Sequence, residues 1–197
     1  NNLGLTLTIQ SQLDEAVVSF MKAIKINPKF DIAYNNLAHT YRQLKQHDSA
    51  LESYEKAIEI NPYFFQAYNN YGNILAKDFN LPDEAINCFN KAIEINPDFA
   101  IAHNNLGNVF KDLNQLDDAL KSYEKAMNLE PDLDNVLGNI LSTKMNSCNW
   151  EGVESLLIDL RDKITSNQKV VNPFTLLGLI DDSALQLKAC EFAMNDN

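Results

Sequence analysis

Apolar and polar positions along this chain alternate with a helical period, and short polar segments interrupt the pattern at regular intervals. Within each stretch, small and apolar residues recur every three to four positions, which is typical of amphipathic helices that bury one face. Alternate stretches end at a proline, which cannot continue the hydrogen-bond ladder of a helix: Pro28, Pro62, Pro97 and Pro131. We therefore predict an all-α chain built from short antiparallel helix pairs.

The sequence itself also repeats, over a period much longer than one helical turn. The segment Lys56-Ala-Ile-Glu-Ile-Asn-Pro62 recurs with small changes before the other three prolines, which are spaced 34, 35 and 34 residues apart. A second motif, Ala33-Tyr-Asn-Asn-Leu-Ala38, recurs at 67–72 and 102–107. Self-similarity at this period indicates a stack of identical supersecondary units.

The residue types at eight positions of each copy resemble the tetratricopeptide repeat. The second copy shows all eight: Tyr34, Leu37, Ala38, Tyr41, Ala50, Tyr54, Ala57 and Pro62. The resemblance covers residues 1–133 as the end of one repeat and three full repeats of 34–35 residues, with boundaries at about 30/31, 64/65 and 99/100. It implies a solenoid, a right-handed α-α superhelix of antiparallel helix pairs whose first helices line the concave face.

Beyond residue 133 the repeat pattern decays. We predict a degenerate fifth helix pair or cap over 134–165, and a connector with a terminal helix over 166–197. Segments around Trp150, Asn172 and Leu187 resemble the linker that joins the repeat array of O-linked N-acetylglucosamine transferases to their catalytic half. That resemblance implies a downstream glycosyltransferase domain, which these residues do not include; the alternative is a simple solenoid cap.

Four local features carry structural expectations. Acidic residues recur where second helices start, and we expect them to cap those helices: Asp14, Asp48, Asp83 and Asp117. We expect Asp181 or Asp182 to be the N-cap of the terminal helix. The third copy has one extra residue, which we place in the turn after Asp78 within that repeat. We expect Trp150 to fill the core beneath the last repeat.

Asparagine recurs in the first helices, although it is a mediocre helix former. One row keeps step with the repeat: Asn2, Asn36, Asn70, Asn105 and Asn139. A carboxamide offers donors and an acceptor, so a row of them can hold the backbone of an extended peptide whatever its side chains. The transferase resemblance implies the same role. The alternative interpretation is structural, with the amides bonding neighbouring helices.

A second set of positions completes the predicted groove. It comprises Asn35, Asn69, Asn104, Asn73, Asn108, Arg42, Lys77 and Lys111. The three basic residues in this set could attract an acidic ligand. The first helices otherwise hold little net charge, which argues against the two-carboxylate clamp of chaperone-binding relatives.

Composition excludes several other classes of function. The formal net charge of −11 disfavours nucleic acid and anionic lipid as partners. The three cysteines are widely spaced, and the three histidines share no metal-ligand spacing, so we expect no disulfide framework, metal or cofactor and a cytoplasmic location. No catalytic motif is present, so we do not expect these residues to form an enzyme.

These observations lead to a functional hypothesis with two rivals. The chain is predicted to be a protein-interaction module that binds an extended polypeptide in its groove, as the substrate-recruiting region of a transferase-like protein. One rival is a stand-alone scaffold or co-chaperone-type adaptor. The other is a homo-oligomerisation module that forms a dimer through its convex side.

Overall fold

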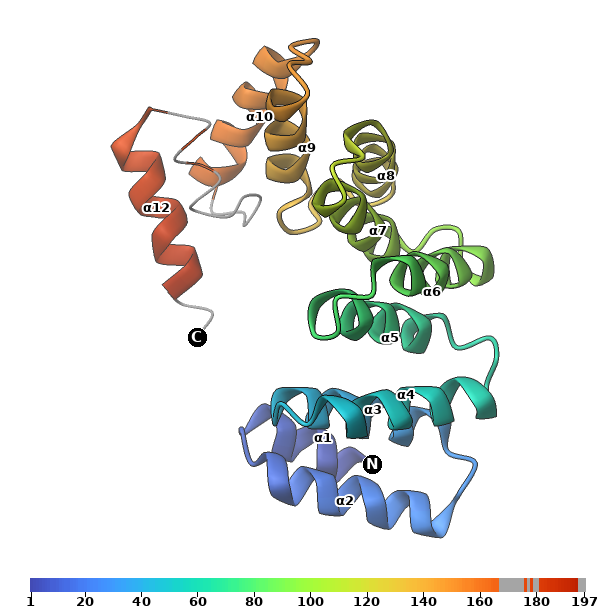
Figure 1. The fold of residues 1–197 in the computed structure, drawn as a ribbon. Coiled ribbons are helices and arrows are strands. Elements are labelled where there is room, and N and C mark those ends of the chain that lie inside the picture. The colour runs from blue at the N-terminus through green and yellow to red at the C-terminus, as the bar shows by residue number, and fades with distance from the viewer. Residues whose placement is uncertain (167–175, 177, 179–180, 195–197) are drawn as a thin grey trace. The chain divides into compact units, whose positions relative to one another are not determined.

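The computed structural model describes residues 1–166, 176, 178 and 181–194. Within them the regular structure is helical throughout, as Figure 1 shows. The helices are α1 (Asn2–Ile9), α2 (Leu13–Ile26), α3 (Asp31–Gln43), α4 (His47–Ile60), α5 (Phe65–Lys77), α6 (Pro82–Ile95), α7 (Ala100–Asp112), α8 (Leu116–Leu129), α9 (Val136–Asn146), α10 (Val153–Thr165) and α12 (Ser183–Met194).

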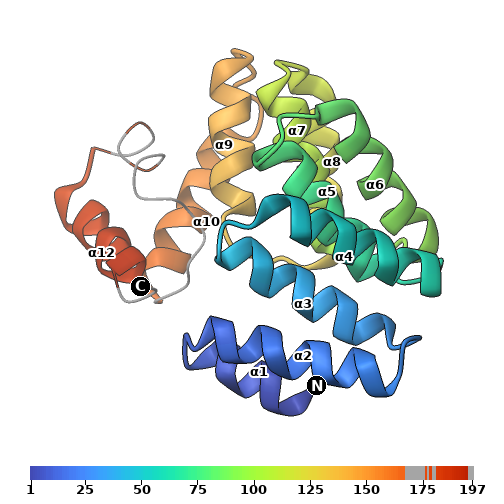
Figure 2. The same ribbon diagram turned by 60° about the horizontal axis from the view of Figure 1, so that its bottom comes forward.

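Consecutive helices pack as pairs, and the chain divides into two compact units. Unit 1 spans Asn1–Pro97 and unit 2 spans Asp98–Asn197. In unit 1 the pairs are α1 with α2, α3 with α4 and α5 with α6, and the second helices α2 and α4 also pack on the first helix of the next pair. Figure 2 shows α1 beside α2 at one end of this unit. Unit 2 begins with the pairs α7–α8 and α9–α10.

The turn inside each of the first four pairs contains one residue with left-handed backbone. These residues are Ser11, Lys45, Asn80 and Asn114, with φ between 55° and 59°. Asparagine tolerates this conformation better than most side chains, which suits it to two of the four turns. The extra residue of the third copy lies in the turn between α5 and α6, as predicted, where it disturbs neither helix.

The interior of each of the first four pairs contains a small residue on the first helix and an aromatic ring on the second. Gly4 faces Phe20, Gly72 faces Phe89 and Gly107 faces Tyr123, so closely that an added Cβ would lie 2.6–2.8 Å from the nearest ring atom. In the second pair Ala38 and Tyr54 belong to one buried cluster. Alanines on the second helices are fully buried in each of these four pairs: Ala16, Ala50, Ala85 and Ala119. These contacts explain the recurrence of small residues.

The acidic residues at the second-helix starts do not act as N-caps. The N-cap positions of α2, α4, α6 and α8 are Gln12, Gln46, Leu81 and Gln115, and none makes a side-chain capping hydrogen bond. The acids lie two positions further in, as the second residue of each helix, where their charge still complements the helix dipole.

The prediction that Trp150 fills the core is wrong. Its side chain lies in the turn before α10 and is 62% exposed. The core beneath the last pair is instead filled by aliphatic side chains: Leu137, Leu141, Val153, Leu160, Ile164 and Leu176.

The terminal helix α12 is capped as predicted. Asp182 precedes it, and its Oδ1 accepts hydrogen bonds from the backbone N–H groups of Ala184 at 3.1 Å and Leu185 at 3.2 Å. The predicted connector, Ser166 to Pro173, lies outside the described residues except for Ser166.

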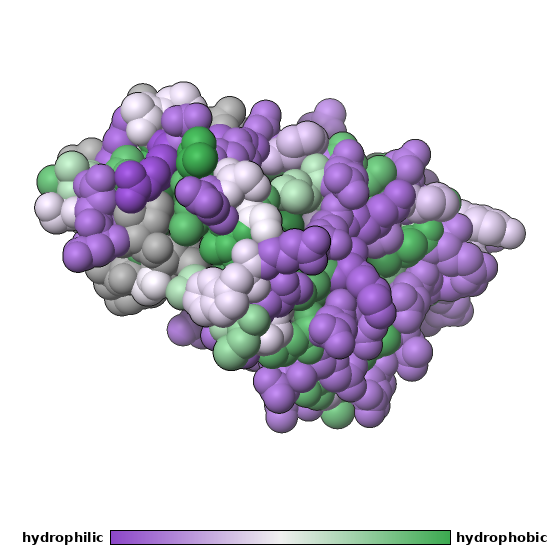
Figure 3. Space-filling model, turned by 90° about the horizontal axis from the view of Figure 1, so that it is seen from above, coloured by the Kyte–Doolittle hydropathy of each residue, from purple (hydrophilic) through white to green (hydrophobic). Residues whose placement is uncertain are grey.

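Hydrophilic side chains dominate the face drawn in Figure 3, with apolar residues in separated patches.

Candidate functional site

The first asparagine row lies on the first helices of the five pairs, as the sequence predicted. Asn36, Asn70 and Asn139 are half-buried and Asn2 is exposed. Asn105 is buried, with only 9% of its surface accessible. Solvent therefore reaches Asn2, Asn36 and Asn70 in unit 1 and Asn139 in unit 2, but hardly reaches Asn105.

A second row is formed by the asparagine that directly precedes four of these positions: Asn1, Asn35, Asn69 and Asn104. Amides of the first row donate hydrogen bonds to this second row, one repeat earlier. Asn36 Nδ2 donates to Asn1 Oδ1, and Asn70 Nδ2 donates to Asn35 Oδ1, both over 3.1 Å. In unit 2, Asn139 Nδ2 donates to Asn104 Oδ1 over 3.4 Å. The recurrence of paired asparagines thus has a structural role, since these bonds connect consecutive first helices.

The same amides also have weak contacts along their own helix. Asn35 Nδ2 lies 3.5 Å from Asn36 Oδ1, and Asn69 Nδ2 lies 3.4 Å from Asn70 Oδ1. A carboxamide has two N–H donors and an oxygen with two lone pairs. These bonds therefore orient the amides of Asn36 and Asn70 and leave each with one further N–H and one further lone pair.

Other predicted groove residues have partners of their own. Asn108 Oδ1 accepts from the Tyr123 hydroxyl at 2.8 Å and from Asn139 Nδ2 at 3.2 Å. Asn69 is buried, with 4% of its surface accessible. Asn73 and Lys111 are half-buried, whereas Lys77 is exposed. The structure thus gives Asn108 an internal role that its position in the repeat did not reveal.

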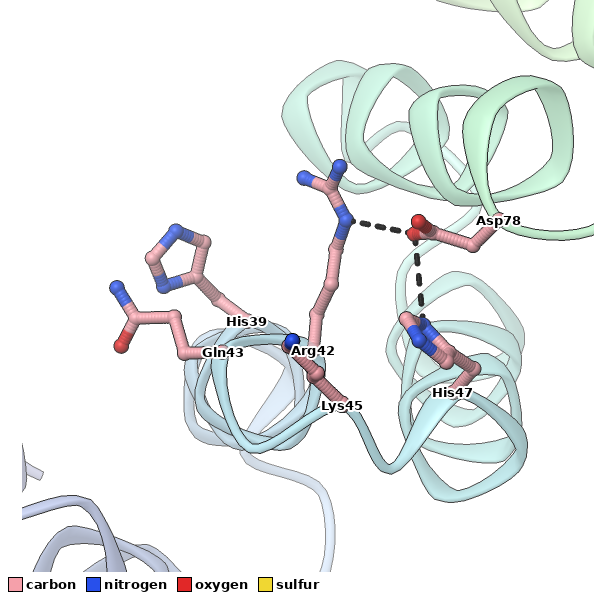
Figure 4. A pocket seen from close by; sticks show the side chains of 6 residues that line it. All are labelled: His39, Arg42, Gln43, Lys45, His47 and Asp78. Carbon is pink, nitrogen blue, oxygen red and sulfur yellow. Dashed lines mark hydrogen bonds and ion pairs between the residues drawn. The ribbon is translucent and has the colours of Figure 1, made fainter.

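Arg42 lies in a polar pocket of about 470 Å³ within unit 1, drawn in Figure 4. Its Nε atom donates to Asp78 Oδ2 over 2.9 Å, and His47 Nδ1 lies 3.5 Å from the same oxygen. Figure 4 shows the two terminal nitrogens of Arg42 pointing away from Asp78. The pocket lining consists of His39, Arg42, Gln43, Lys45, His47 and Asp78. Because Arg42 and Lys45 outnumber the single carboxylate, the pocket suits an acidic group.

Burial and the neighbouring Arg42 charge lower the pKa of His39 from its ordinary value of 6.5. Both effects disfavour the imidazolium form. His39 is thus expected to be neutral near pH 7 and to offer hydrogen bonding rather than charge to this pocket.

Neither a metal-binding cluster nor a membrane-spanning helix occurs in the described part of the chain. No group of three or more His, Cys, Asp or Glu side chains there is placed to hold a metal ion. None of the helices described is both long and apolar enough to cross a bilayer.

Comparison with known protein families identifies the repeat. Models described as "Tetratricopeptide repeat" match residues 32–64, 53–86 and 100–133, and a model described as "TPR repeat" matches 4–45 and 83–114. Together these matches run without a gap from residue 4 to residue 133, which is more than half of the chain. The chain belongs to the tetratricopeptide repeat family.

Solved structures with similar folds agree with this assignment. PilF from Pseudomonas aeruginosa is 21% identical with a TM-score of 0.79, over 98% of this chain and 87% of that protein. MamA is 21% identical with a TM-score of 0.73, over 83% of this chain and 95% of MamA. YrrB, described as "a TPR protein with an unusual peptide-binding site", is 19% identical with a TM-score of 0.63, over 96% and 89% of the two chains.

These likenesses confirm the predicted all-α class of tetratricopeptide solenoids. A search of curated proteins finds no match. The tetratricopeptide models thus identify the chain as a protein-interaction module.

Proposed function

We propose that this chain is an adaptor that holds an extended polypeptide along its first helices and performs no catalysis itself. The observation that carries the proposal is the partial exposure and the hydrogen bonding of the Asn36 and Asn70 side chains. Their amides are half-buried, oriented by hydrogen bonds to the preceding repeat, and retain one donor and one acceptor each. Oriented donors and acceptors bind at a lower cost in conformational entropy than mobile ones.

The spacing of the rows suits an extended guest. Packed helices lie about 8–10 Å apart, and an extended chain rises about 3.3 Å per residue. Successive first helices would thus present one amide to about every third residue of the guest. Contacts of this kind involve the peptide backbone, so we expect affinity with little dependence on the guest's side chains.

The pocket around Arg42 adds a preference for acidic residues. Asn35, His39 and Arg42 follow one another at four- and three-residue steps, which places them on one stripe of α3. Arg42 lies about two turns further along α3, beside the path of a guest that crosses the first helices, so a side chain of that guest would point along α3 to reach its guanidinium. We expect an acidic side chain at that point of the guest, while roles for Lys77, Lys111 and Asn73 stay predictions.

Of the two interpretations of the parent protein, the stand-alone adaptor is the better supported. The tetratricopeptide models account for residues 4–133, and the YrrB structure is described as having a peptide-binding site. The resemblance of the segment after residue 133 to a glycosyltransferase linker gains no support from these comparisons. We therefore propose the adaptor role and leave the transferase link as a hypothesis.

The test is a peptide selected from a random library on the native chain, with its affinity measured by calorimetry. The double substitution Asn36→Ala and Asn70→Ala should weaken binding at least about tenfold, the effect of one or two lost hydrogen bonds. The matched control is Asn87→Ala with Asn90→Ala, two exposed asparagines on the second helix α6. Equal loss in both variants, or no loss in the first, would contradict the proposal.

A further inference from the structure

The second helix of the first pair, α2, differs from its counterparts on the face that is turned to solvent. Aligning the repeats places four positions of α2 on one narrow stripe, at spacings of four, three and four residues: Asp14, Val18, Met21 and Lys25. All four are exposed, with Val18 and Met21 at 50% and 53% accessibility. Within unit 1, this face of α2 therefore buries neither apolar side chain.

The equivalent stripes of the other second helices are polar throughout. They are Asp48, Glu52, Glu55 and Glu59 on α4, Asp83, Asn87, Asn90 and Glu94 on α6, and Asp117, Lys121, Glu124 and Asn128 on α8. All twelve of these residues are exposed. Packing within a repeat thus does not require an apolar residue at either central position, so Val18 and Met21 need another explanation.

The charges of α2 are also distributed differently. On α4 and α6 the last position of the stripe is a glutamate that pairs with the lysine three residues earlier, as in Lys56–Glu59 and Lys91–Glu94. On α2 that position is Lys25, and Lys22 lies one turn before it, so positive charge gathers at one end of the helix. Negative charge gathers at the other end, at Asp14 and Glu15.

This stripe is complementary to itself when two copies run antiparallel. The order of spacings reads the same in both directions, so a two-fold axis between residues 19 and 20 would place Val18 against the partner's Met21. The same axis would place Asp14 against the partner's Lys25, giving two apolar contacts and an ion pair at each end. A parallel arrangement would oppose like charges and is disfavoured.

We propose that α2 is a homodimerisation surface, in which the stripe Asp14–Val18–Met21–Lys25 packs antiparallel on the same stripe of a second copy. A two-fold contact of this kind uses one patch twice, as most soluble homodimers do. One helix face buries less than the roughly 800 Å² per partner of a standard interface, so the dimer should be weak and concentration-dependent.

The inference is independent of the peptide-binding proposal, because the stripe lies on a second helix and the asparagine rows lie on first helices. Sedimentation equilibrium of the 197-residue chain up to millimolar concentration tests it. Val18→Glu with Met21→Glu should weaken self-association at least about tenfold. Its thermal midpoint should change little, since α4 carries Glu52 and Glu55 at these positions. Glu52→Gln with Glu55→Gln on α4 is the matched control and should leave association unchanged.

Charge exchange tests the antiparallel register. Lys25→Glu alone should weaken association, because it brings a second carboxylate opposite the partner's Asp14, and adding Asp14→Lys should restore it. A native chain that stays monomeric at every concentration would overturn the proposal. A Val18→Glu, Met21→Glu variant that dimerises like the native chain would also overturn it. So would an Asp14→Lys, Lys25→Glu variant that self-associates more weakly than Lys25→Glu alone.

Discussion

Asn70 Nδ2 donates to Asn35 Oδ1 over 3.1 Å, across the boundary between two consecutive repeats. Both residues belong to the motif that recurs in the first helices, and the same bond joins Asn36 to Asn1. The paired asparagines therefore contribute to stacking before any guest is present.

This bond should appear as an energetic coupling in a double-mutant cycle. Asn35→Ala and Asn70→Ala each remove one side of the hydrogen bond, and the coupling between them should be about 0.5–1.5 kcal/mol. Urea unfolding of the two single variants and the double variant measures it. If the two single substitutions lower the free energy of unfolding by amounts that simply add in the double variant, the two amides do not interact in solution.

The contact between Gly107 and Tyr123 predicts that Gly107→Ala is destabilising. An added Cβ would lie 2.7 Å from two ring carbons of Tyr123, and the Tyr123 hydroxyl is held by Asn108 at 2.8 Å. The ring cannot move aside without straining that bond, so the loss should be about 1–3 kcal/mol despite alanine's better helix propensity. The reference is Gly178→Ala, because no atom of the described residues lies within 4 Å of a Cβ there. A Gly107→Ala variant as stable as the native chain would mean that the ring adapts.

The three cysteines should differ sharply in reactivity. Burial, with a smaller effect from the Glu84 charge, raises the pKa of Cys88 to about 11. At pH 8 roughly 0.1% of this thiol would be thiolate, which is the reactive form. Cys148 and Cys190 are exposed. Brief treatment with iodoacetamide, followed by peptide mass spectrometry, should find Cys148 and Cys190 modified and Cys88 largely free, and rapid labelling of Cys88 would contradict this.

Titration of His39 tests the electrostatics of the Arg42 pocket. Burial and then the Arg42 charge lower the His39 pKa below 6.5, so the folded chain binds fewer protons here than the unfolded chain. Stability at this site therefore rises as pH rises through that range. Arg42→Gln should raise the pKa of His39 without restoring it to 6.5, because burial is the larger cause. An NMR titration measures both values, and a native His39 that titrates at or above 6.5 would contradict the pocket geometry.

Much of the fold could be predicted because the signal repeats. The prolines, the small residues and the aromatics recur in step, so the same reasoning applied to each helix pair. The burial of Trp150 could not be predicted correctly, because this residue lies where the repeat pattern has decayed and no equivalent position in the other copies indicates which way it faces. The sequence does not separate an N-cap from the second residue of a helix, because acidic residues are favourable at both positions.

The candidate site was predictable only in part. The period of the asparagines located both rows on the first helices. It did not show that Asn36 and Asn70 bond to the repeat before them, because such bonds depend on how consecutive helices are placed in space. The partner of Arg42 was hidden for the same reason, since Asp78 belongs to the next repeat and lies in the turn that holds the extra residue.

Backbone recognition is the central claim, and modification of the guest tests it most directly. A peptide selected on the native chain should be prepared in two series, one with single N-methylated backbone amides and one with single alanine side chains. Calorimetry should find that N-methylation at every second or third position weakens binding about tenfold or more, while most alanine substitutions change it less than about threefold. The opposite result, with affinity lost through side-chain removal and kept through N-methylation, would contradict the account of the amide rows.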